Sequence, residues 1–267
     1  MHFFISQILK NNYCMFSVER LQAGLNTKFL GREIKYLDQT PSTNDDAWNY
    51  FHNGSPNGTL VITDDQQHGR GRRKNKWFST KEKTLTFSFI LYPEIGLGKL
   101  GLLPLLTGVS IVQSIKSSAS IQTGLKWPND IMLNGKKMGG ILIESRTTQN
   151  RLGVVVGVGL NINETMHDIP NFLKDQTTSL AIYSEASCNR ERILSAVLNK
   201  FERLYTQKWD SIIPIWRKYC IHKDSEVVFH TENGLHQGIF QGISSDGHAE
   251  IQINGKTQTF PSGMITL

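Results

Sequence analysis

The stretch that decides the fold covers residues 131–144 and reads IMLNGKKMGGILIE. Two apolar runs flank Asn134-Gly135, a dipeptide that readily adopts the positive φ angles of a two-residue type I′ turn. We therefore predict a β-hairpin that pairs Ile131–Leu133 with Met138–Glu144. Because the strands of a hairpin are antiparallel, this stretch argues against a fold built only from parallel βαβ units.

Further strand patterns lie on both sides of the hairpin. In Leu85–Leu91 every second residue is apolar, so we expect a strand with one clear apolar face. Leu152–Leu160 is rich in valine and is bounded by glycine, which also predicts a strand. Leu60–Thr63 and Leu125–Trp127 are shorter strand candidates.

Three helix patterns accompany these strands. Ser42–Phe51 begins with residues that can cap a helix, and Asp45 and Asp46 fall in its first turn, where the helix dipole favours anions. Leu100–Ile115 is apolar on more than one side and predicts a buried helix, whereas Arg190–Trp209 carries apolar residues at helical spacing. This mixture of hairpins and helices predicts an α+β fold, with helices on one side of a mixed central sheet.

The character of the chain changes near Ile221. From Glu226 onward, short strand patterns alternate with turn dipeptides, which are Asn233-Gly234, Asp246-Gly247 and Asn254-Gly255. Regular spacing of this kind predicts a small C-terminal β-barrel of the SH3-like type. We therefore divide the chain into a short leader at 1–33, a main domain at 34–221 and the barrel at 222–267.

The composition is that of a globular protein. A chain of 267 residues, 39% of them hydrophobic, can bury one sizeable core and a smaller second one. The formal net charge of +6 favours an acidic partner, such as nucleotide phosphates, nucleic acid or an acidic protein, although scattered solvated lysines also produce it.

The cysteines and the N-terminus indicate the compartment. Cys14, Cys188 and Cys220 are far apart in sequence, so no metal spacing exists and the odd, sparse count fits a reducing environment. Met1–Phe16 has no basic region before its apolar residues and no small-residue cleavage site after them. We expect neither a signal peptide nor a membrane span. We therefore expect a cytoplasmic protein.

The segment from Gly69 to Trp77 is the sharpest chemical signal in the sequence. It holds five cations, which are Arg70, Arg72, Arg73, Lys74 and Lys76, and they repel one another unless water or bound anions screen them. Gly69 and Gly71 allow close approach of a ligand to the backbone, and guanidinium groups match the oxygens of carboxylates and phosphates. A solvated basic loop, an RNA-binding Arg-Gly segment and a loop for nucleotide phosphates all remain open. The pattern does not match a Walker A loop.

Four further segments each have both a structural and a functional interpretation. In Lys126–Asp130 the aspartate follows a short strand, where it could coordinate Mg²⁺ together with substrate phosphate or simply belong to an Asx turn. Lys137 starts the second strand of the hairpin, where it could be solvent-exposed or could neutralise a carboxylate or phosphate. Gly157-Val158-Gly159 lacks the third glycine of a dinucleotide fingerprint, and Ser42-Thr43-Asn44 could be only a helix cap. The sequence shows no Ser-His-Asp pattern, no zinc spacing and no paired carboxylates in these segments.

Taken in order, these segments resemble the biotin protein ligase family. The matching segments are Ser42-Thr43-Asn44, Gln66-Gln67, Gly69-Arg70-Gly71-Arg72-Arg73 with Lys76-Trp77, Lys126-Trp127-Pro128-Asn129-Asp130, Lys137 with Gly140-Ile141-Leu142, and Gly157–Asn161. The strong match covers about residues 34–165, and the predicted barrel also fits the family. Each motif alone is weak, but all of them in the order and at the spacing of the family are specific.

The resemblance implies an ATP-dependent ligase with the catalytic domain at 34–221. Such an enzyme activates biotin as biotinoyl-5′-AMP and transfers it to one lysine of the biotin carboxyl carrier domain of acetyl-CoA carboxylase. The implied biotin-binding residues are Ser42, Thr43, Asn44, Gln66, Arg70, Gly71, Arg72, Lys137 and Gly140, and the apolar floor would include Trp127. The implied ATP-binding residues are Arg73, Trp77, Asn129, Asp130 and Asn161. Arg72 and Lys137 would be catalytic, and Asp130 would contact Mg²⁺.

The sequence departs from the family pattern in three places. His68 stands where a small residue is common, and Lys74-Asn75 replaces a glycine-plus-basic pair seen in some members. The 33-residue leader is shorter than the helix-turn-helix module of regulatory members, so we expect no DNA-binding domain. The resemblance also implies a possible homodimer.

Two alternatives compete with the ligase interpretation. A lipoate or octanoate protein transferase shares the catalytic fold, but the basic loop and Lys126–Asp130 favour biotin. A nucleic-acid-binding protein could use the Arg-Gly loop and the barrel, but its cations would be expected along a face rather than in one loop.

Overall fold

The computed structural model describes residues 15–266 except 95–96, 149–150, 208 and 232–233. Residues 1–14 of the predicted leader, which include Cys14, lie outside the described residues. Asn233 of the predicted Asn233-Gly234 turn lies outside them as well. The described part of the leader contains α2, Val18–Gly24, which Ser17 caps by accepting a hydrogen bond from the backbone N–H of Arg20.

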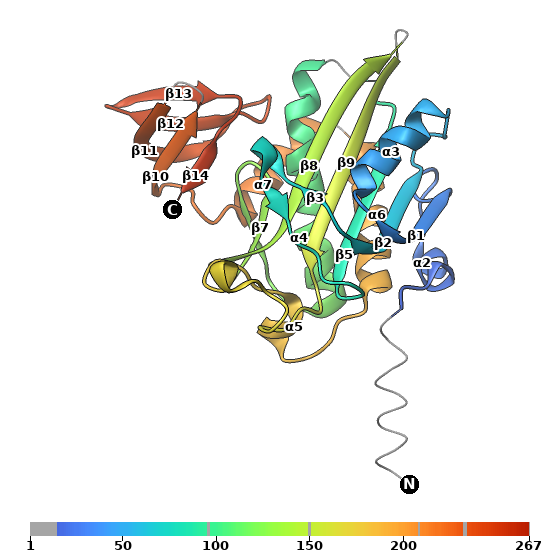
Figure 1. Ribbon diagram of the computed structural model, residues 1–267. Coiled ribbons are helices and arrows are strands. Elements are labelled where there is room, and N and C mark those ends of the chain that lie inside the picture. Colours follow the sequence, from blue (N-terminus) through green and yellow to red (C-terminus); the bar gives the residue numbers. More distant parts are fainter. Residues whose placement is uncertain (1–14, 95–96, 149–150, 208, 232–233, 267) are drawn as a thin grey trace.

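A seven-stranded sheet forms the centre of the molecule (Figure 1). Its strands, in spatial order, are β1 (Ile34–Thr40), β2 (Leu60–Gln66), β5 (Thr84–Leu91), β9 (Arg151–Asn161), β8 (Lys136–Thr148), β7 (Asp130–Leu133) and β6 (Gly124–Lys126). β1 pairs with β2 in parallel, whereas every other neighbouring pair is antiparallel. The sheet is therefore mixed, as the sequence predicts.

The β7–β8 hairpin confirms the turn that the sequence predicts. Asn134 and Gly135 have φ angles of 48° and 74°, the two positive values that a type I′ turn requires. Asn tolerates the left-handed region better than most residues, and Gly adopts it without steric cost.

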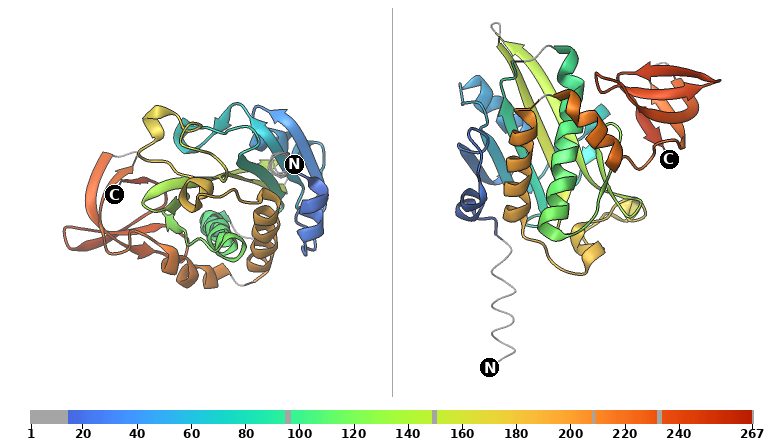
Figure 2. Two further views of the ribbon diagram at one scale, coloured as in Figure 1. Left: turned by 90° about the horizontal axis from the view of Figure 1, so that it is seen from below. Right: turned by 180° about the vertical axis from the view of Figure 1, so that it is seen from behind.

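Helices cover both faces of this sheet. The long helices α4 (Leu103–Ala119) and α6 (Arg190–Tyr205) lie side by side on one face and bury the main apolar core, as predicted (Figure 2). The shorter helix α3 (Thr43–His52) packs on the opposite face, where Trp48 and Phe51 form a second, smaller cluster with Val61, Ile90 and Val155. The prediction of helices on one side therefore holds only for the two long helices.

Strand β5 is buried along its whole length, which corrects the prediction of a single apolar face. Phe87 and Phe89 belong to the main core, while Ile90 belongs to the cluster under α3. The polar alternates of this strand therefore face protein rather than water. This position of α3 directs Ser88 toward the start of a helix, a contact that determines the binding site below.

The described residues between 226 and 266 form a second, antiparallel sheet of five strands. Its order is β13 (Lys256–Phe260), β12 (Ala249–Ile253), β11 (Gly234–Ile243), β10 (Glu226–Thr231) and β14 (Met264–Thr266). Among the described residues β13 and β14 remain the two edges, so no pairing closes the sheet into the barrel that was predicted. A closed barrel needs its edge strands to pair along their length, and β14 has only three residues.

The two sheets are connected by direct contacts. The helix α7 (Ile212–Tyr219) leads into the second sheet and packs against α4. Trp127 is buried between the sheets, where its indole Nε1 donates to the carbonyl of Gly247 at 3.1 Å and its ring lies 6.0 Å from that of Phe229. One core cluster therefore includes residues of both sheets.

The helical stretch Gly98–Ala119 is long and apolar enough to cross a membrane by composition alone. It consists of a short 3₁₀ turn, Leu97–Leu102, followed by α4. Figure 2 shows α4 packed between the sheet and its neighbouring helices, and eleven of its residues are buried. This stretch is the central core helix, which accounts for its apolar composition.

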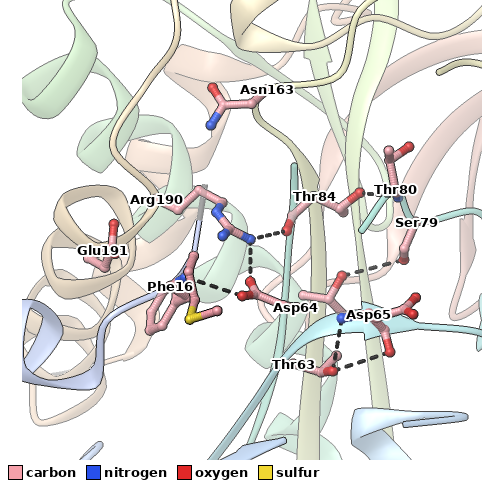
Figure 3. Close-up of polar contacts among 12 residues, drawn as sticks. Phe16, Thr63, Asp64, Asp65, Ser79, Thr80, Thr84, Asn163, Arg190 and Glu191 are labelled. Atoms are coloured by element: carbon pink, nitrogen blue, oxygen red, sulfur yellow. Dashed lines mark hydrogen bonds and ion pairs between the residues drawn. The ribbon is translucent and has the colours of Figure 1, made fainter. Parts of the chain in front are cut away.

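A buried ion pair fixes the start of the described chain to the sheet (Figure 3). Arg190, at the start of α6, lies 2.7 Å from Asp64 of β2 and donates to the carbonyl of Thr84 at 3.2 Å. Asp64 also accepts from the backbone N–H of Phe16 at 3.2 Å and from the hydroxyl of Tyr36 at 2.8 Å. Four separate segments thus meet at one carboxylate.

Candidate functional site

The predicted site residues gather around one cavity of about 150 Å³ between the sheet, the basic loop and the second sheet. The cavity is lined by Ser42, Thr43, Asn44, Gln66, Arg70, Gly71, Arg72, Arg73, Trp77, Trp127, Asn129, Asp130, Lys137 and Gly140. Every predicted biotin-binding residue is therefore at this cavity. Of the predicted ATP-binding residues, Asn161 alone lies elsewhere, in an adjoining cavity described below.

One end of the cavity is a buried network of hydroxyl and amide groups. Ser42 caps α3, accepting from the backbone N–H of Asp45, and this cap fixes the positions of the next two residues. The side-chain oxygen of Gln66 accepts from the backbone N–H of Thr43 at 2.9 Å. The hydroxyl of Ser88 lies 2.7 Å from both the Thr43 hydroxyl and the Asn44 amide oxygen. This end can donate and accept several hydrogen bonds without rearrangement.

Glu144 of β8 holds the other side of Asn44. Its carboxylate accepts from the Asn44 amide at 2.9 Å, from the Trp48 indole at 3.3 Å and from Arg70 at 3.1 Å. Burial raises the pKa of Glu144, but the hydrogen bonds from Asn44 and the charge of Arg70 outweigh it, so the pKa lies below its ordinary value. Glu144 is therefore a carboxylate that orients Asn44, with its oxygens directed at donors of the protein.

The glycines of β9 provide the space that these side chains occupy. A Cβ at Gly157 would lie 1.9 Å from the side-chain oxygen of Asn44, and one at Gly159 would lie 2.4 Å from the Trp77 ring. Any larger residue at either position would displace a side chain that lines the cavity. The Gly157-Val158-Gly159 motif thus has a steric role in the site rather than a role in a dinucleotide-binding turn.

The basic segment forms a short ribbon over the cavity. β3 (Gly69–Arg70) pairs with β4 (Lys76–Trp77), and the backbone N–H of Gly71 donates to the Asn75 carbonyl at 2.7 Å to close the turn. Arg73, inside this turn, adopts a left-handed φ of 53°. The ribbon places Arg70 and Arg72 at the cavity and lays the indole of Trp77 against Gly159.

The arginines of the ribbon already have partners. Arg70 is 41% exposed and pairs with Asp45 at 2.6 Å as well as with Glu144. Arg72 donates to the carbonyl of Gly263 at 3.4 Å, and Arg73 donates to that of His230 at 3.3 Å. Burial, followed by the charge of Arg73, lowers the pKa of the Arg72 guanidinium. Arg72 is therefore a partly desolvated cation, and an anion bound beside it would interact strongly with it.

Asp130 and two lysines form a charged group on the floor of the cavity. The ammonium of Lys137 lies 2.6 Å from Asp130, and that of Lys126 lies 3.6 Å from it. Among the residues that the structure describes, no group of three or more His, Cys, Asp or Glu side chains could hold a metal ion. Mg²⁺ usually takes one or two carboxylates, substrate phosphates and water, so Asp130 fits as a single protein ligand.

A second cavity adjoins the first along Trp77 and Lys137, which line both. Asn161 lines it, and the Asn161 amide donates to the carbonyl of Thr178 at 3.0 Å. Its other walls combine apolar residues, including Phe78, Ile169 and Leu173, with polar ones such as Ser79, Thr80 and Asp168, and Glu164 is buried beside them. An indole, apolar walls and an amide suit a flat heteroaromatic ring better than a phosphate chain.

Comparisons with known proteins agree with this geometry. Residues 36–161 match the model of the biotin/lipoate A/B protein ligase family. The bifunctional ligase/repressor BirA of Bacillus spizizenii is 37% identical over 236 residues, which cover 86% of this chain and 73% of that relative. The chain belongs to the biotin protein ligase family.

Other relatives extend the likeness over most of the ligase. The biotin–[acetyl-CoA-carboxylase] ligase of Mycobacterium tuberculosis is 28% identical and is matched over 87% of this chain and 88% of its own. The biotin protein ligase from Aquifex aeolicus in complex with biotin and ATP has a TM-score of 0.76 at 27% identity, covering 88% of this chain and 98% of that chain. The likeness therefore rests on the whole fold and not on single motifs.

The structure adds residues to the ligase site that the sequence did not single out. These are Ser88 and Glu144, which hydrogen-bond residues that line the cavity, and the segment from Gly263 to Ile265, which lines the cavity from the second sheet. Ser88 is a polar alternate of its predicted strand and looked like a solvent-facing residue, whereas Glu144 is only the last residue of the predicted hairpin strand. Nothing in the local pattern indicates that 263–265 would reach the site, because that contact depends on how the two sheets pack.

Proposed function

We propose that this ligase activates biotin with ATP as biotinoyl-5′-AMP and transfers the biotinoyl group to a lysine of a biotin carboxyl carrier protein. The observation that carries the proposal is the position of Lys137, whose side chain lines both cavities at their junction. A two-substrate activation needs the carboxylate and the α-phosphate to meet at one point, with positive charge beside both. The proposed acceptor is the carrier subunit of acetyl-CoA carboxylase, which a relative's name specifies.

The polar end of the first cavity supports biotin as the carboxylic acid that is activated. The ureido ring of biotin has two N–H donors and one carbonyl acceptor, and the network of Thr43, Asn44, Gln66 and Ser88 offers both kinds of partner. The dithiolane ring of lipoate has no such groups and would gain no hydrogen bonds from the network while it covers polar atoms, which costs affinity. The same network therefore argues against lipoate as the substrate.

The second cavity supports ATP as the activating substrate. In the proposal, adenine lies between Trp77 and the apolar wall, with Asn161 at its edge, so the phosphates reach back toward Lys137 and Asp130. Arg73 and Asn129 belong to the proposed nucleotide contacts as well. Asp130 would hold Mg²⁺ on the triphosphate, and the ion would supply charge neutralisation when bound.

The proposed reaction needs no covalent enzyme intermediate. A carboxylate oxygen of biotin attacks the α-phosphorus, and the bond to the bridging oxygen breaks to release pyrophosphate. The ε-amine of the acceptor lysine then attacks the acyl carbon, loses a proton, and AMP leaves. Lys137 and Arg72 neutralise the charge of the two anions as they approach, and the ribbon excludes water from the mixed anhydride.

We also propose that the ligase is cytoplasmic and forms a homodimer. Cys188 and Cys220 are both free in the structure, which suits a reducing compartment. Sedimentation of the purified chain with and without biotin and ATP measures the oligomeric state directly.

Pyrophosphate exchange tests the proposed activity. Purified protein with ATP and labelled pyrophosphate should form labelled ATP only when biotin is added, because the first step must run in both directions. Lipoate and octanoate are the matched control acids. Exchange with lipoate and none with biotin would overturn the assignment of the substrate.

A further inference from the structure

Two exposed phenylalanines lie together beside the second cavity: Phe78 lines it, and Phe172 packs against Phe78 between the lining residues Pro170 and Leu173. Phe78 is 43% exposed and Phe172 is 70% exposed, and their rings meet edge to face with centroids 5.7 Å apart. Phe78 directly follows Trp77 at the end of the ribbon, whereas Phe172 lies in the 3₁₀ turn Asn171–Leu173. We call these two residues the rim pair.

The rim pair is fixed in position relative to Lys137. The segment that carries Phe172 returns to β8, where the backbone N–H of Lys137 donates to the Gln176 carbonyl at 2.7 Å and that of Thr178 donates to the Lys137 carbonyl at 3.0 Å. Lys136 adds a side-chain hydrogen bond to the Lys174 carbonyl at 3.0 Å. The Phe172 segment is therefore hydrogen-bonded to the start of β8, and Phe78 is linked to it through the ring contact.

The exposure of these rings is unfavourable in the isolated protein. A phenyl ring left in water forgoes about 2 kcal/mol of burial energy, and the turn at 171–173 buries none of its residues. Met166, in the same segment, is 41% exposed. Exposed aromatic groups of this kind, next to polar and charged rims, are typical of protein interaction sites.

We propose that the rim pair is part of the docking surface for the acceptor domain that presents the target lysine. This inference rests on the proposed function, because an amine that reaches the adenylate beside Lys137 must belong to a protein that covers the mouth of the site. Arg73 and Lys76 in the adjacent ribbon are exposed cations, so the acceptor face that fits would be apolar at its centre and acidic around it. The same cations, with the net charge of +6, disfavour a second copy of this chain as the occupant.

Steady-state biotinylation of a recombinant carrier domain tests the docking surface. Phe172→Ser should raise the KM for the carrier domain about tenfold and leave kcat within about twofold, because the ring contributes to docking and not to chemistry. Tyr183→Ser is the matched control, since Tyr183 is also an exposed aromatic residue, at 52%, on the helix α5 (Leu180–Ser184). The control should leave the KM unchanged.

Two further measurements separate docking from other roles. Biotin-dependent pyrophosphate exchange and capture of the adenylate by hydroxylamine, a small nucleophile, should be equal for Phe172→Ser and wild type. A parallel loss of hydroxylamine capture, or an unchanged KM for the carrier domain, would overturn the proposal. So would a change from dimer to monomer in the Phe172→Ser variant, which would assign the rim pair to self-association. Wild-type protein without any biotin-dependent exchange would instead refute the proposed function.

Discussion

Glu164 is the residue whose protonation the fold perturbs most among those that line the second cavity. It is 3% exposed, and burial raises its pKa from 4.5 to about 7, although hydrogen bonds from Thr84 and the backbone oppose the shift. The Thr84 hydroxyl donates to one carboxyl oxygen at 2.5 Å. The folded state therefore binds the Glu164 proton more tightly than the unfolded chain does.

The contribution of Glu164 to the stability of the protein should accordingly fall as the pH rises. Because the folded pKa of Glu164 exceeds the unfolded value, its contribution is fully present below about pH 4.5 and is lost as the pH passes about 7. The loss from this one group amounts to at most about 3 kcal/mol of the free energy of unfolding. Glu164→Gln should remove that pH dependence, which denaturant unfolding at about pH 5 and about pH 8 measures. Glu185→Gln, at an exposed position, is the control, and an equal pH slope in wild type and Glu164→Gln would contradict the expectation.

At the scale of elements, the ribbon from Gly69 to Trp77 changes most between sequence and structure. As a sequence it is a basic segment with three open interpretations, whereas in the structure β3 and β4 pair and the arginines are shared with other elements. Arg72 points to the carbonyl of Gly263 in the second sheet. The Asn75 carbonyl, at one of the positions where the sequence departs from its family, closes the turn by accepting from Gly71.

Arg72→Gly should weaken retention of the adenylate. The variant loses a partly desolvated forked donor, and a charge-assisted hydrogen bond of this kind is worth about 1.5–3 kcal/mol, or roughly ten- to a hundredfold in the rate of release. Biotinylation of bystander lysines in an added, unrelated protein measures the released adenylate. The Arg73→Gly variant, which loses the neighbouring cation instead, should release less adenylate than Arg72→Gly. Equal leakage from wild type and Arg72→Gly would show that the ribbon retains the adenylate without this guanidinium.

At the scale of the whole molecule, the Asp64–Arg190 pair joins the N-terminal segment, β1, β2, β5 and α6 (Figure 3). Both side chains are buried, so either charge alone would be costly. β2 ends two residues later at Gln66, one of the residues of the polar network. The same strand thus connects the biotin-binding end of the cavity to the attachment of the N-terminal segment.

Asp64→Ala should destabilise the protein by about 3–5 kcal/mol, because it leaves the Arg190 charge buried and removes the acceptor of Phe16 and Tyr36. Urea unfolding followed by circular dichroism gives the free energy. Asp38→Ala, at an exposed position of β1, should change it by less than about 0.5 kcal/mol. Similar values for the two variants would mean that the pair contributes little to folding.

Much of this architecture could be predicted from the sequence. The helix start at Ser42, the Asn134-Gly135 turn, the core helix and the strands of the central sheet other than β1 follow from local spacing and turn chemistry, and the structure confirms them, whereas the edge strand β1 was not predicted. The predicted biotin-binding residues also meet at one cavity. These features depend on residues close to one another in the chain, so their signals survive without any knowledge of the tertiary fold.

The tertiary structure decided which surfaces meet. Ser88 looks like a solvent-facing residue of an alternating strand, but α3 covers that face, and the Ser88 hydroxyl bonds Thr43 and Asn44, which line the cavity. The open second sheet, the reach of Gly263 to Arg72 and the sharing of Lys137 by two cavities depend on contacts between distant segments. Periodicity specifies which side of an element is apolar, whereas the partner of that side follows from strand order and packing, which no local pattern encodes.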